Sequence, residues 1–229
     1  MVQTPLAICL QDLRFGWRRS DDLLRIASLE IRRGERVFLQ GASGCGKSTL
    51  LSLLAGICTP RHGTLQILGE DLATLSGAQR DDYRRAHMGL IFQLLNLLPY
   101  LSVIENVTLP ARISRARLGV RGGELRDEAL YLLSALGLRD RALLARPVTS
   151  LSVGQQPRVA AARALIGRPQ LVLADEPTSA LDADTRQRFL ELLQGECAKR
   201  EAALLFVSHD ASLAPAFDRA LHMHDLNRV

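Results

Sequence analysis

Residues 41–48 read G-A-S-G-C-G-K-S, and this stretch restricts the possible folds more than any other part of the chain. The apolar run Val37-Phe38-Leu39 before it predicts a strand, and the leucine-rich residues 48–55 after it predict a helix that stops at Gly56. The stretch matches G-x-x-x-x-G-K-[ST] in the strand, loop and helix context that phosphate binding requires. A chance glycine-rich turn is the alternative, and the flanking elements disfavour it.

The positions of this phosphate loop have separate expected roles. We expect Lys47 to reach the β- and γ-phosphates of a nucleotide, the Ser48 hydroxyl to bind Mg²⁺, and Thr49 to contact the α-phosphate. Glycines let the main-chain N–H groups curl around a phosphate, and the helix N-terminus adds its positive dipole end. Further nucleotide contacts are expected from the other loop residues: Gly41, Ala42, Ser43, Gly44, Cys45 and Gly46.

A second apolar strand supplies two carboxylates. Residues 171–174 read Leu-Val-Leu-Ala and lead into Asp175 and Glu176. Such a pair is by itself more often a solvated turn, but α/β sheets bind ligands at the carboxyl ends of their strands. Successive strand residues point in opposite directions, so the two acids cannot serve one metal equally. We assign Asp175 to the Mg²⁺ shell and Glu176 to orienting or deprotonating the attacking water.

The distribution of apolar runs predicts the fold class. Residues 37–39, 171–174 and 203–207 show no polar alternation and are separated by helical patterns, which indicates a parallel sheet buried on both faces. Residues 23–31 alternate and predict extended structure in a β-rich N-terminal part. We therefore expect an α/β phosphate-loop NTPase core (RecA-like) with an N-terminal antiparallel β-subdomain.

A helical insert interrupts this core. One helical face is expected to carry Leu125, Ala129, Leu132, Leu133 and Leu136, and Gly137 closes the helix. We expect one domain over residues 1–229, with a core lobe formed by residues 1–93 and 159–229 and a helical lobe formed by residues 94–158. Leucine-rich turns and an Arg-rich stretch are expected at the start of that lobe. Further helices are expected over about 156–166 and 183–199.

The amino-acid composition limits the cellular environment and the ligand classes that we expect. The four cysteines form no C-x-x-C pair, so a reducing, cytosolic environment without a disulfide framework or zinc site is expected. No apolar run reaches the roughly 18 residues of a membrane span, so we expect the chain itself not to cross a bilayer. The formal charge of +5 suits nucleotide phosphate, anionic lipid or nucleic acid and does not choose among them.

One further motif separates the nucleotide-binding classes. GTPases, kinases, helicases and transport ATPases all carry a phosphate loop, but the guanine-reading Asn-Lys-x-Asp motif is missing here. Residues 151–158 read L-S-V-G-Q-Q-P-R, and Ser152 stands 23 residues before Asp175. Taken together, these motifs resemble the ATP-binding cassette (ABC) ATPase family over nearly the whole chain. The resemblance implies an ATPase that converts ATP and water into ADP and phosphate.

The resemblance also assigns roles to residues outside the two phosphate-site motifs. Trp17 resembles the aromatic residue that stacks on adenine, and Gln93 resembles the glutamine that touches Mg²⁺ and the attacking water. Asp182 falls in a segment similar to the D-loop, and His209 resembles the switch histidine on the γ-phosphate. Residues 152–155 resemble the signature motif, which makes Ser152, Gly154 and Gln155 nucleotide contacts. Glu176, His209, Gln93 and Lys47 are the expected catalytic residues.

The signature motif implies a dimer. Ser152 and Gly154 precede a predicted helix, where hydroxyl, amide and helix dipole form a second anion site. In the family this site serves the partner subunit's ATP, and two subunits pack head to tail around two nucleotides; we expect a homodimer. Val153 replaces the usual glycine and Pro157 a polar residue, which puts turnover in doubt more than the fold. Proline in a first helical turn loses only an N–H that is unpaired anyway, so that helix should survive.

Residues 89–107 look most like the lipoprotein-release, macrolide-efflux and cell-division ATPases of the family. That subgroup implies separate membrane permease subunits and a peripheral position on the inner face of the cell membrane. Exposed leucines after Gln93 would suit a groove for a permease helix, and burial in the core is the alternative for each of them. Two other functions stay open. One is an ATP-gated scaffold with little turnover. The other is a DNA-associated ATPase, although such proteins usually need a long coiled-coil insert and 229 residues leave no room for one.

Overall fold

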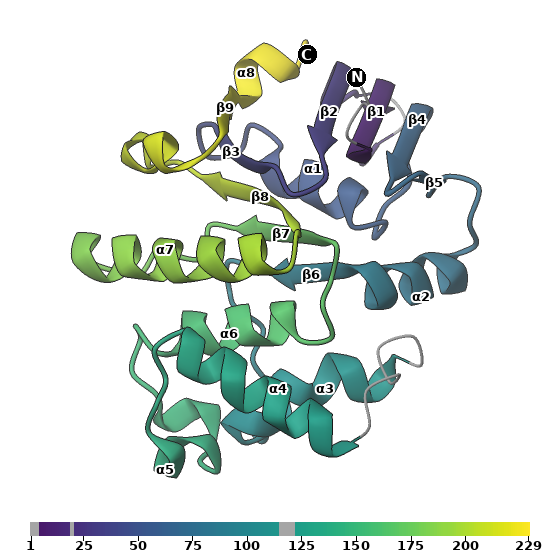
Figure 1. The fold of residues 1–229 in the computed structure, drawn as a ribbon. Helices are drawn as coiled ribbons and strands as arrows, with labels where there is room; N and C mark the ends of the chain where they lie inside the picture. Colours follow the sequence, from purple (N-terminus) through teal and green to yellow (C-terminus); the bar gives the residue numbers. More distant parts are fainter. Residues whose placement is uncertain (1–4, 19–20, 115–121) are drawn as a thin grey trace.

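The computed structural model describes residues 5–18, 21–114 and 122–229, whose strands form two sheets (Figure 1). The N-terminal sheet is antiparallel with the order β2-β1-β4-β5, and the other is parallel with the order β6-β7-β8-β3-β9. The strands are β1 Leu6–Phe15, β2 Leu24–Arg32, β3 Arg36–Gln40, β4 His62–Ile67, β5 Glu70–Asp71, β6 Met88–Ile91, β7 Leu171–Asp175, β8 Ala203–Ser208 and β9 Arg219–His222.

The helices belong to two groups. In Figure 1, α3, α4, α5 and α6 gather below the parallel sheet, and α7 runs along its flank. The α-helices are α1 Lys47–Leu54, α2 Gly77–His87, α3 Val103–Ile113, α4 Gly122–Ala135, α5 Arg141–Leu144, α6 Gln156–Leu165, α7 Ala183–Lys199 and α8 Met223–Leu226. Two 3₁₀ turns, η2 Val148–Ser150 and η3 Ala211–Ala216, complete the set.

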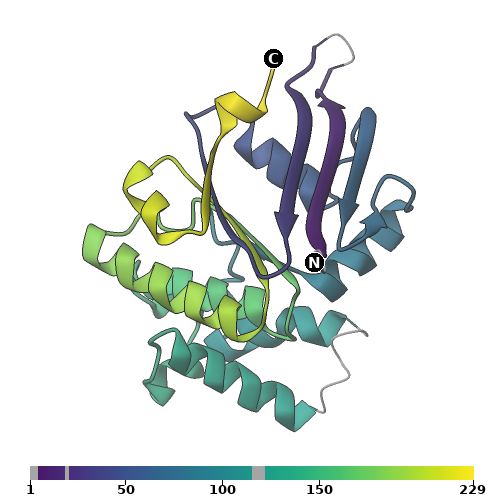
Figure 2. The same cartoon turned by 45° about the horizontal axis from the view of Figure 1, so that its top comes forward.

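The parallel sheet is buried on both faces, as the apolar runs predict. In β3, Val37 and Leu39 pack with α1 and the antiparallel sheet, whereas Phe38 faces the core that includes α6 and α7. In β8, Leu205 and Phe206 divide between the same two cores. Adjacent side chains on a strand point to opposite faces, so an uninterrupted apolar run is what a sheet covered twice requires. Figure 2 shows α1 behind β1 and β2.

The expected α/β class, antiparallel N-terminal sheet and helical insert are all confirmed. Helix α4 buries Leu125, Leu132 and Leu133, and Gly137 just after the helix takes the left-handed φ of 83°. Helices α6 and α7 lie within a residue of their expected bounds. Helix α6 runs without a break through residues 158 and 159, where the lobe boundary was placed, and the division into lobes stays a prediction.

The longest elements that were not foreseen from the sequence are β1, α2 and α3. Strand β1 carries polar residues at two consecutive positions, Gln11 and Asp12, which obscure its alternation. Helix α2 buries no residue, so no apolar stripe marks it, and it begins at a capping box formed by Ser76 and Gln79. Helix α3 follows the leucine-rich turns of residues 93–101 and begins at a second capping box, Ser102 with Glu105.

The Arg-rich stretch expected after these turns lies only partly in the structure. Arg112 lies in the last turn of α3, whereas residues 115–121 lie outside the described residues. Within the described part of the chain, every helix is too short or too polar to cross a membrane.

The strand order brings distant motifs together. Strands β7, β8 and β3 are neighbours, and their registers align Asp175 with Val207 and Gln40 with Ser208. Strand β6 lies on the other side of β7 and aligns Ile91 with Ala174. The loops that leave these four strands therefore meet at one edge of the parallel sheet.

Candidate functional site

A hollow of about 510 Å³ opens at this edge of the sheet. It is lined by residues of the loop after β3, of the turns after β6 and β7, of the loop after β8, and of the segment before β2: Ser43, Gly44, Gly46, Lys47, Ser48, Thr49, Gln93, Glu176, His209 and Leu23. All except Leu23 were predicted as site residues. Leu23 precedes β2, and no sequence signal of ours pointed to it.

Glycine at the start of α1 is a steric requirement. Gly46 is the N-cap of α1, with a left-handed φ of 97° that residues with a side chain rarely adopt. A Cβ atom there would also lie 2.7 Å from Leu24 Cδ2. The backbone can therefore turn directly from the loop into the helix, which leaves the first N–H groups of α1 at the hollow.

Lys47 is the buried cation of the site. Its side chain is 6% exposed, and Nζ donates hydrogen bonds to the carbonyl oxygens of Gly41 at 2.7 Å and Ala42 at 2.8 Å. Nζ also lies 3.5 Å from Glu176 Oε1. The ammonium group is thus held over the loop, where its charge meets few competing water molecules.

Glu176 lies between the ammonium group of Lys47 and the imidazole of His209. Its other carboxylate oxygen, Oε2, lies 2.9 Å from Nδ1 of His209, which follows β8. The Glu176 backbone is left-handed with φ of 42°, and its N–H donates to Val207 O at 2.9 Å. A non-glycine residue in this region costs free energy and is held there by its surroundings, an arrangement that recurs at functional sites.

Asp175 points elsewhere than Glu176 and accepts a hydrogen bond from the Ser48 side chain. Burial raises the pKa of the Asp175 carboxyl, the neighbouring Glu176 charge raises it further, and the Ser48 hydrogen bond and Lys47 oppose the rise. The sequence argument separated the two acids by strand alternation. In the structure, the left-handed turn at Glu176 contributes to that separation.

The donor set around Asp175 fits Mg²⁺. One carboxylate and one hydroxyl offer hard oxygen ligands and leave positions for water and substrate phosphates, which is how Mg²⁺ is commonly held. Across the described ranges, no group of three or more His, Cys, Asp or Glu side chains could hold a metal alone. The residues present therefore suit a metal that arrives with a phosphate ligand.

The signature residues lie away from this hollow. Ser152 is exposed before α6, and its N–H donates to Gln155 Oε1 at 3.0 Å, while Gln155 is the N-cap of the helix. Pro157 stands in the first turn of α6 without breaking it, as expected. Val153 is 61% exposed, and its backbone is not left-handed, so a side chain at this position costs no backbone strain.

Two further predicted contacts do not line the hollow. Trp17 is 67% exposed and meets Phe15 edge to face, with ring centroids 5.1 Å apart. Asp182 is the N-cap of α7 and accepts from the Thr185 N–H at 2.9 Å; this bond lowers the pKa of the Asp182 carboxyl. An exposed ring and a capping carboxylate can meet a ligand only on the outer surface. Their roles toward nucleotide stay predictions.

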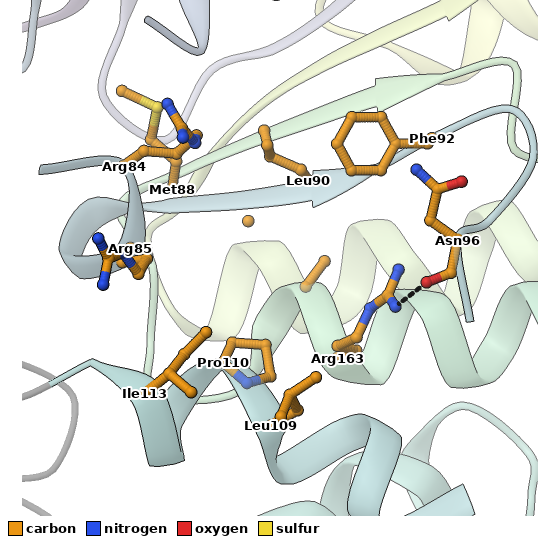
Figure 3. A pocket seen from close by; sticks show the side chains of 12 residues that line it. Arg84, Arg85, Met88, Leu90, Phe92, Asn96, Leu109, Pro110, Ile113 and Arg163 are labelled. Carbon is orange, nitrogen blue, oxygen red and sulfur yellow. Dashed lines mark hydrogen bonds between the residues drawn. The ribbon is translucent and has the colours of Figure 1, made fainter. Parts of the chain in front are cut away.

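A second hollow of about 270 Å³ lies on the other side of β6 (Figure 3). Its walls come from α2, β6, α3 and α6, with apolar side chains such as Phe92, Leu109 and Ile113 and with three arginines, Arg84, Arg85 and Arg163.

The leucines after Gln93 divide between the two alternatives. Leu94 is 85% exposed, whereas Leu95 and Leu97 pack against the core. Neither a uniform docking surface nor uniform burial describes this segment.

Comparisons with known proteins agree with this geometry. Residues 24–179 match the family model described as ABC transporter. The chain is 40% identical over 210 residues to a lipoprotein-releasing system ATP-binding protein LolD of Syntrophotalea carbinolica, covering 92% of this chain and 89% of that protein. The LolD protein of Novosphingobium aromaticivorans is 44% identical over 208 residues, covering 89% and 88%.

Solved structures show the same fold. The ATP-binding cassette MJ0796, in a dimeric post-hydrolysis state bound to ADP and Pi, superposes with a TM-score of 0.84 at 32% identity. The match covers 94% of this chain and 93% of that one. A second dimeric structure of MJ0796, a bacterial ABC transporter cassette, gives a TM-score of 0.83.

Proposed function

The chain belongs to the ABC transporter family, in which it is an ATP-binding and ATP-hydrolysing subunit, and on this basis we propose a role for each of its site residues. Lys47 holds the β- and γ-phosphates, Glu176 orients and deprotonates the attacking water, and His209 and Gln93 complete the site. The observation that carries this proposal is the position of one carboxylate, Glu176, between the ammonium of Lys47 and the imidazole of His209.

The charges suggest an order of events. In the structure, Lys47 donates hydrogen bonds to the carbonyl oxygens of Gly41 and Ala42 and lies close to the Glu176 carboxylate. A triphosphate carries more negative charge than Glu176, so its γ-phosphate competes for Lys47 and frees the carboxylate. Glu176 can then accept a proton from water while His209 Nδ1 keeps it oriented. Water attacks the γ-phosphorus in line, and the bond to the β-phosphate oxygen breaks to leave ADP and phosphate.

Ser48, Asp175 and Gln93 are the residues proposed to hold Mg²⁺. When bound, the ion neutralises charge that develops on the phosphate oxygens. The raised pKa of Asp175 follows from burial of a carboxylate beside Glu176, and a divalent cation would offset that cost. Trp17 and Thr49 are proposed to contact the adenine and the α-phosphate.

We further propose a head-to-tail homodimer in which Ser152, Gly154 and Gln155 contact the partner's ATP. Support comes from the exposure of Ser152 just before α6, with Gly154 and Gln155 half-buried beside it, and from the fact that none of the three lines the hollow. Asp182 caps α7 on the exposed surface, which suits a place at the same seam. The dimeric MJ0796 structures add a precedent at 32% identity.

The partner in the membrane is proposed to be a separate permease, which would place this chain on the inner face of the cell membrane. The relatives named LolD suggest lipoprotein release as the task. The hollow of Figure 3 is the proposed docking groove, since its apolar walls suit a helix.

Replacing Glu176 by glutamine tests the proposed mechanism. Glutamine keeps the size and the hydrogen-bond acceptor but cannot take a proton, so Glu176→Gln should bind MgATP while turnover falls at least ~100-fold. Size-exclusion chromatography with ATP should show accumulated dimers. Glu191→Gln, on the exposed side of α7, is the matched control and should hydrolyse normally. Wild-type turnover in Glu176→Gln would contradict the proposed role of Glu176. If the chain is instead a scaffold with little turnover, the unmodified chain should hydrolyse little ATP even with its permease present.

A further inference from the structure

The turn that carries Gln93 has an unusual backbone. Leu95 and Asn96, two and three residues after Gln93, are both left-handed, with φ of 58° and 48°. Leu95 N–H donates to Phe92 O at 2.8 Å, and Asn96 N–H donates to Leu94 O at 2.6 Å, so the chain folds tightly back on itself. Asparagine tolerates this conformation, but leucine does so only at a cost in free energy. Something outside the turn must therefore hold it.

Arg163 supplies that hold. Its guanidinium donates from NH1 to Asn96 O at 2.6 Å and from NH2 to Leu95 O at 2.5 Å, so one guanidinium holds both left-handed residues. Figure 3 shows the bond to Asn96. No ion pair joins Arg163 to a carboxylate in the parts of the chain that the structure describes. Burial lowers the pKa of the guanidinium, which nevertheless stays charged at neutral pH. The side chain is thus committed to two backbone carbonyls.

The position of Arg163 links two parts of the proposed site. Arg163 lies near the end of α6, 11 residues after Ser152, on the helix whose N-terminus carries the signature residues. The turn it grips leaves β6 and places Gln93 at the nucleotide hollow. Arg163 also lines the second hollow, where Asn96 is its neighbour. A shift of α6 would therefore pull directly on the turn behind Gln93.

We propose that Arg163 is a positioning residue for hydrolysis, which locks the turn behind Gln93 to the signature helix. The inference rests on the proposed function, because it takes Gln93 as part of the hydrolytic pocket. Arg163 touches no nucleotide, so its loss should lower the rate of hydrolysis and leave nucleotide affinity intact. Lysine cannot replace it, since one ammonium group cannot reproduce a planar fork that serves two carbonyls.

The test compares Arg163→Gln and Arg163→Lys with Arg158→Gln in the full chain. Arg158 is the matched control because it lies on the same helix and donates to Leu136 O at 3.3 Å, a contact that does not reach the Gln93 turn. Arg163→Gln should lower kcat about tenfold, as displaced catalytic groups do, with Arg163→Lys close to it. The KM for ATP should stay within about twofold of wild type. Hydrogen exchange of residues 92–98 should quicken in both Arg163 variants and not in Arg158→Gln.

A second variant distinguishes positioning from general loss of packing. Glycine adopts positive φ without strain, so Leu95→Gly in the Arg163→Gln background should recover part of the lost kcat. If Arg163 only supports packing, removing the Leu95 side chain as well should lower kcat further, and that result would overturn the inference. Equal kcat and equal exchange in Arg163→Gln and Arg158→Gln would overturn it too. Loss of turnover in Glu176→Gln would still stand in that case, so the two proposals can fail separately.

Discussion

At Asp175, the charged carboxylate that the proposed metal site needs lowers the stability of the fold. The carboxyl lies beside Glu176 in a partly buried place, and its pKa is raised above the ordinary value by burial. A group with a raised pKa in the folded state binds its proton more tightly there than in the unfolded chain. Its contribution to the free energy of unfolding therefore falls as pH rises from the ordinary carboxyl pKa through the raised one. At neutral pH, the charged carboxylate is a cost that the fold carries for its ligand.

Asp175→Asn should separate these two effects. The amide keeps the shape and can still pair with Ser48 but carries no charge, so Tm without nucleotide at pH 7 should rise by about 2 °C. The gain should shrink as pH falls toward 4, where the wild-type carboxyl takes up its proton. Hydrolysis of MgATP should be lost in the same variant. Thermal unfolding across pH with Asp225→Asn, an exposed control, checks the prediction; a lower Tm at pH 7 contradicts it.

Helix packing decides where a partner can dock. The groove of Figure 3 forms because α3 and α6 pack closely while α2 and β6 stand on its other side. Only the structure reveals this groove, because α2 and α3 were not predicted as helices. Its apolar wall ends at Ile113, which is 56% exposed at the end of α3, and Arg84 and Arg85 stand at the basic side. Because the Ile113 side chain is so exposed, we expect its replacement to have little effect on the stability of the fold.

Ile113→Glu should weaken docking without unfolding the chain. The new charge would have to be buried against an apolar partner, so the chain retained on washed cell membranes should fall at least about tenfold. ATP hydrolysis by the isolated chain should be unchanged. Val229→Glu, at a still more exposed apolar position at the other end of the molecule, is the control. A photo-crosslinker at position 113 should capture an integral membrane protein, and membrane retention equal to that of the control variant counts against the groove.

At the scale of the whole molecule, the phosphate loop and the signature residues do not meet. The phosphate loop lies at the edge of the parallel sheet, whereas Ser152 lies at the exposed start of α6. Under the proposed head-to-tail arrangement, a single chain presents half of each of two sites. A closed two-fold dimer would complete both sites at once, because each subunit would offer its signature residues to the other.

Mixing two inactive variants tests this arrangement. Lys47→Ala removes the phosphate contact of one subunit, and Ser152→Arg blocks the signature of the other, so each alone should be inactive. An equal mixture should recover about a quarter of wild-type ATPase activity, because half of randomly paired dimers are mixed and each holds one intact site of two. No recovery, together with a wild type that stays monomeric at saturating ATP, would contradict the head-to-tail dimer.

Local sequence determined the phosphate loop, the Asp175 and Glu176 pair, the buried parallel strands and helices α4, α6 and α7. These features depend on spacing and on apolar periodicity, which act over a few residues. Helix α2 escaped prediction because it buries nothing, and α3 because its leucine-rich approach concealed the capping box. Leu23 and Arg163 escaped because their roles depend on neighbours far along the chain.

The sequence by itself determined the motifs, and from them it predicts which residues bind phosphate, hold Mg²⁺ and activate water. Only the tertiary structure decided their relations, among them the carboxylate of Glu176 held between Lys47 and His209, the fork of Arg163 on two strained carbonyls, and the groove beside β6. The physical reason is that a motif records contacts along a few consecutive residues. The order of strands in a sheet, and the packing of helices on it, join residues separated by 33 to 129 positions.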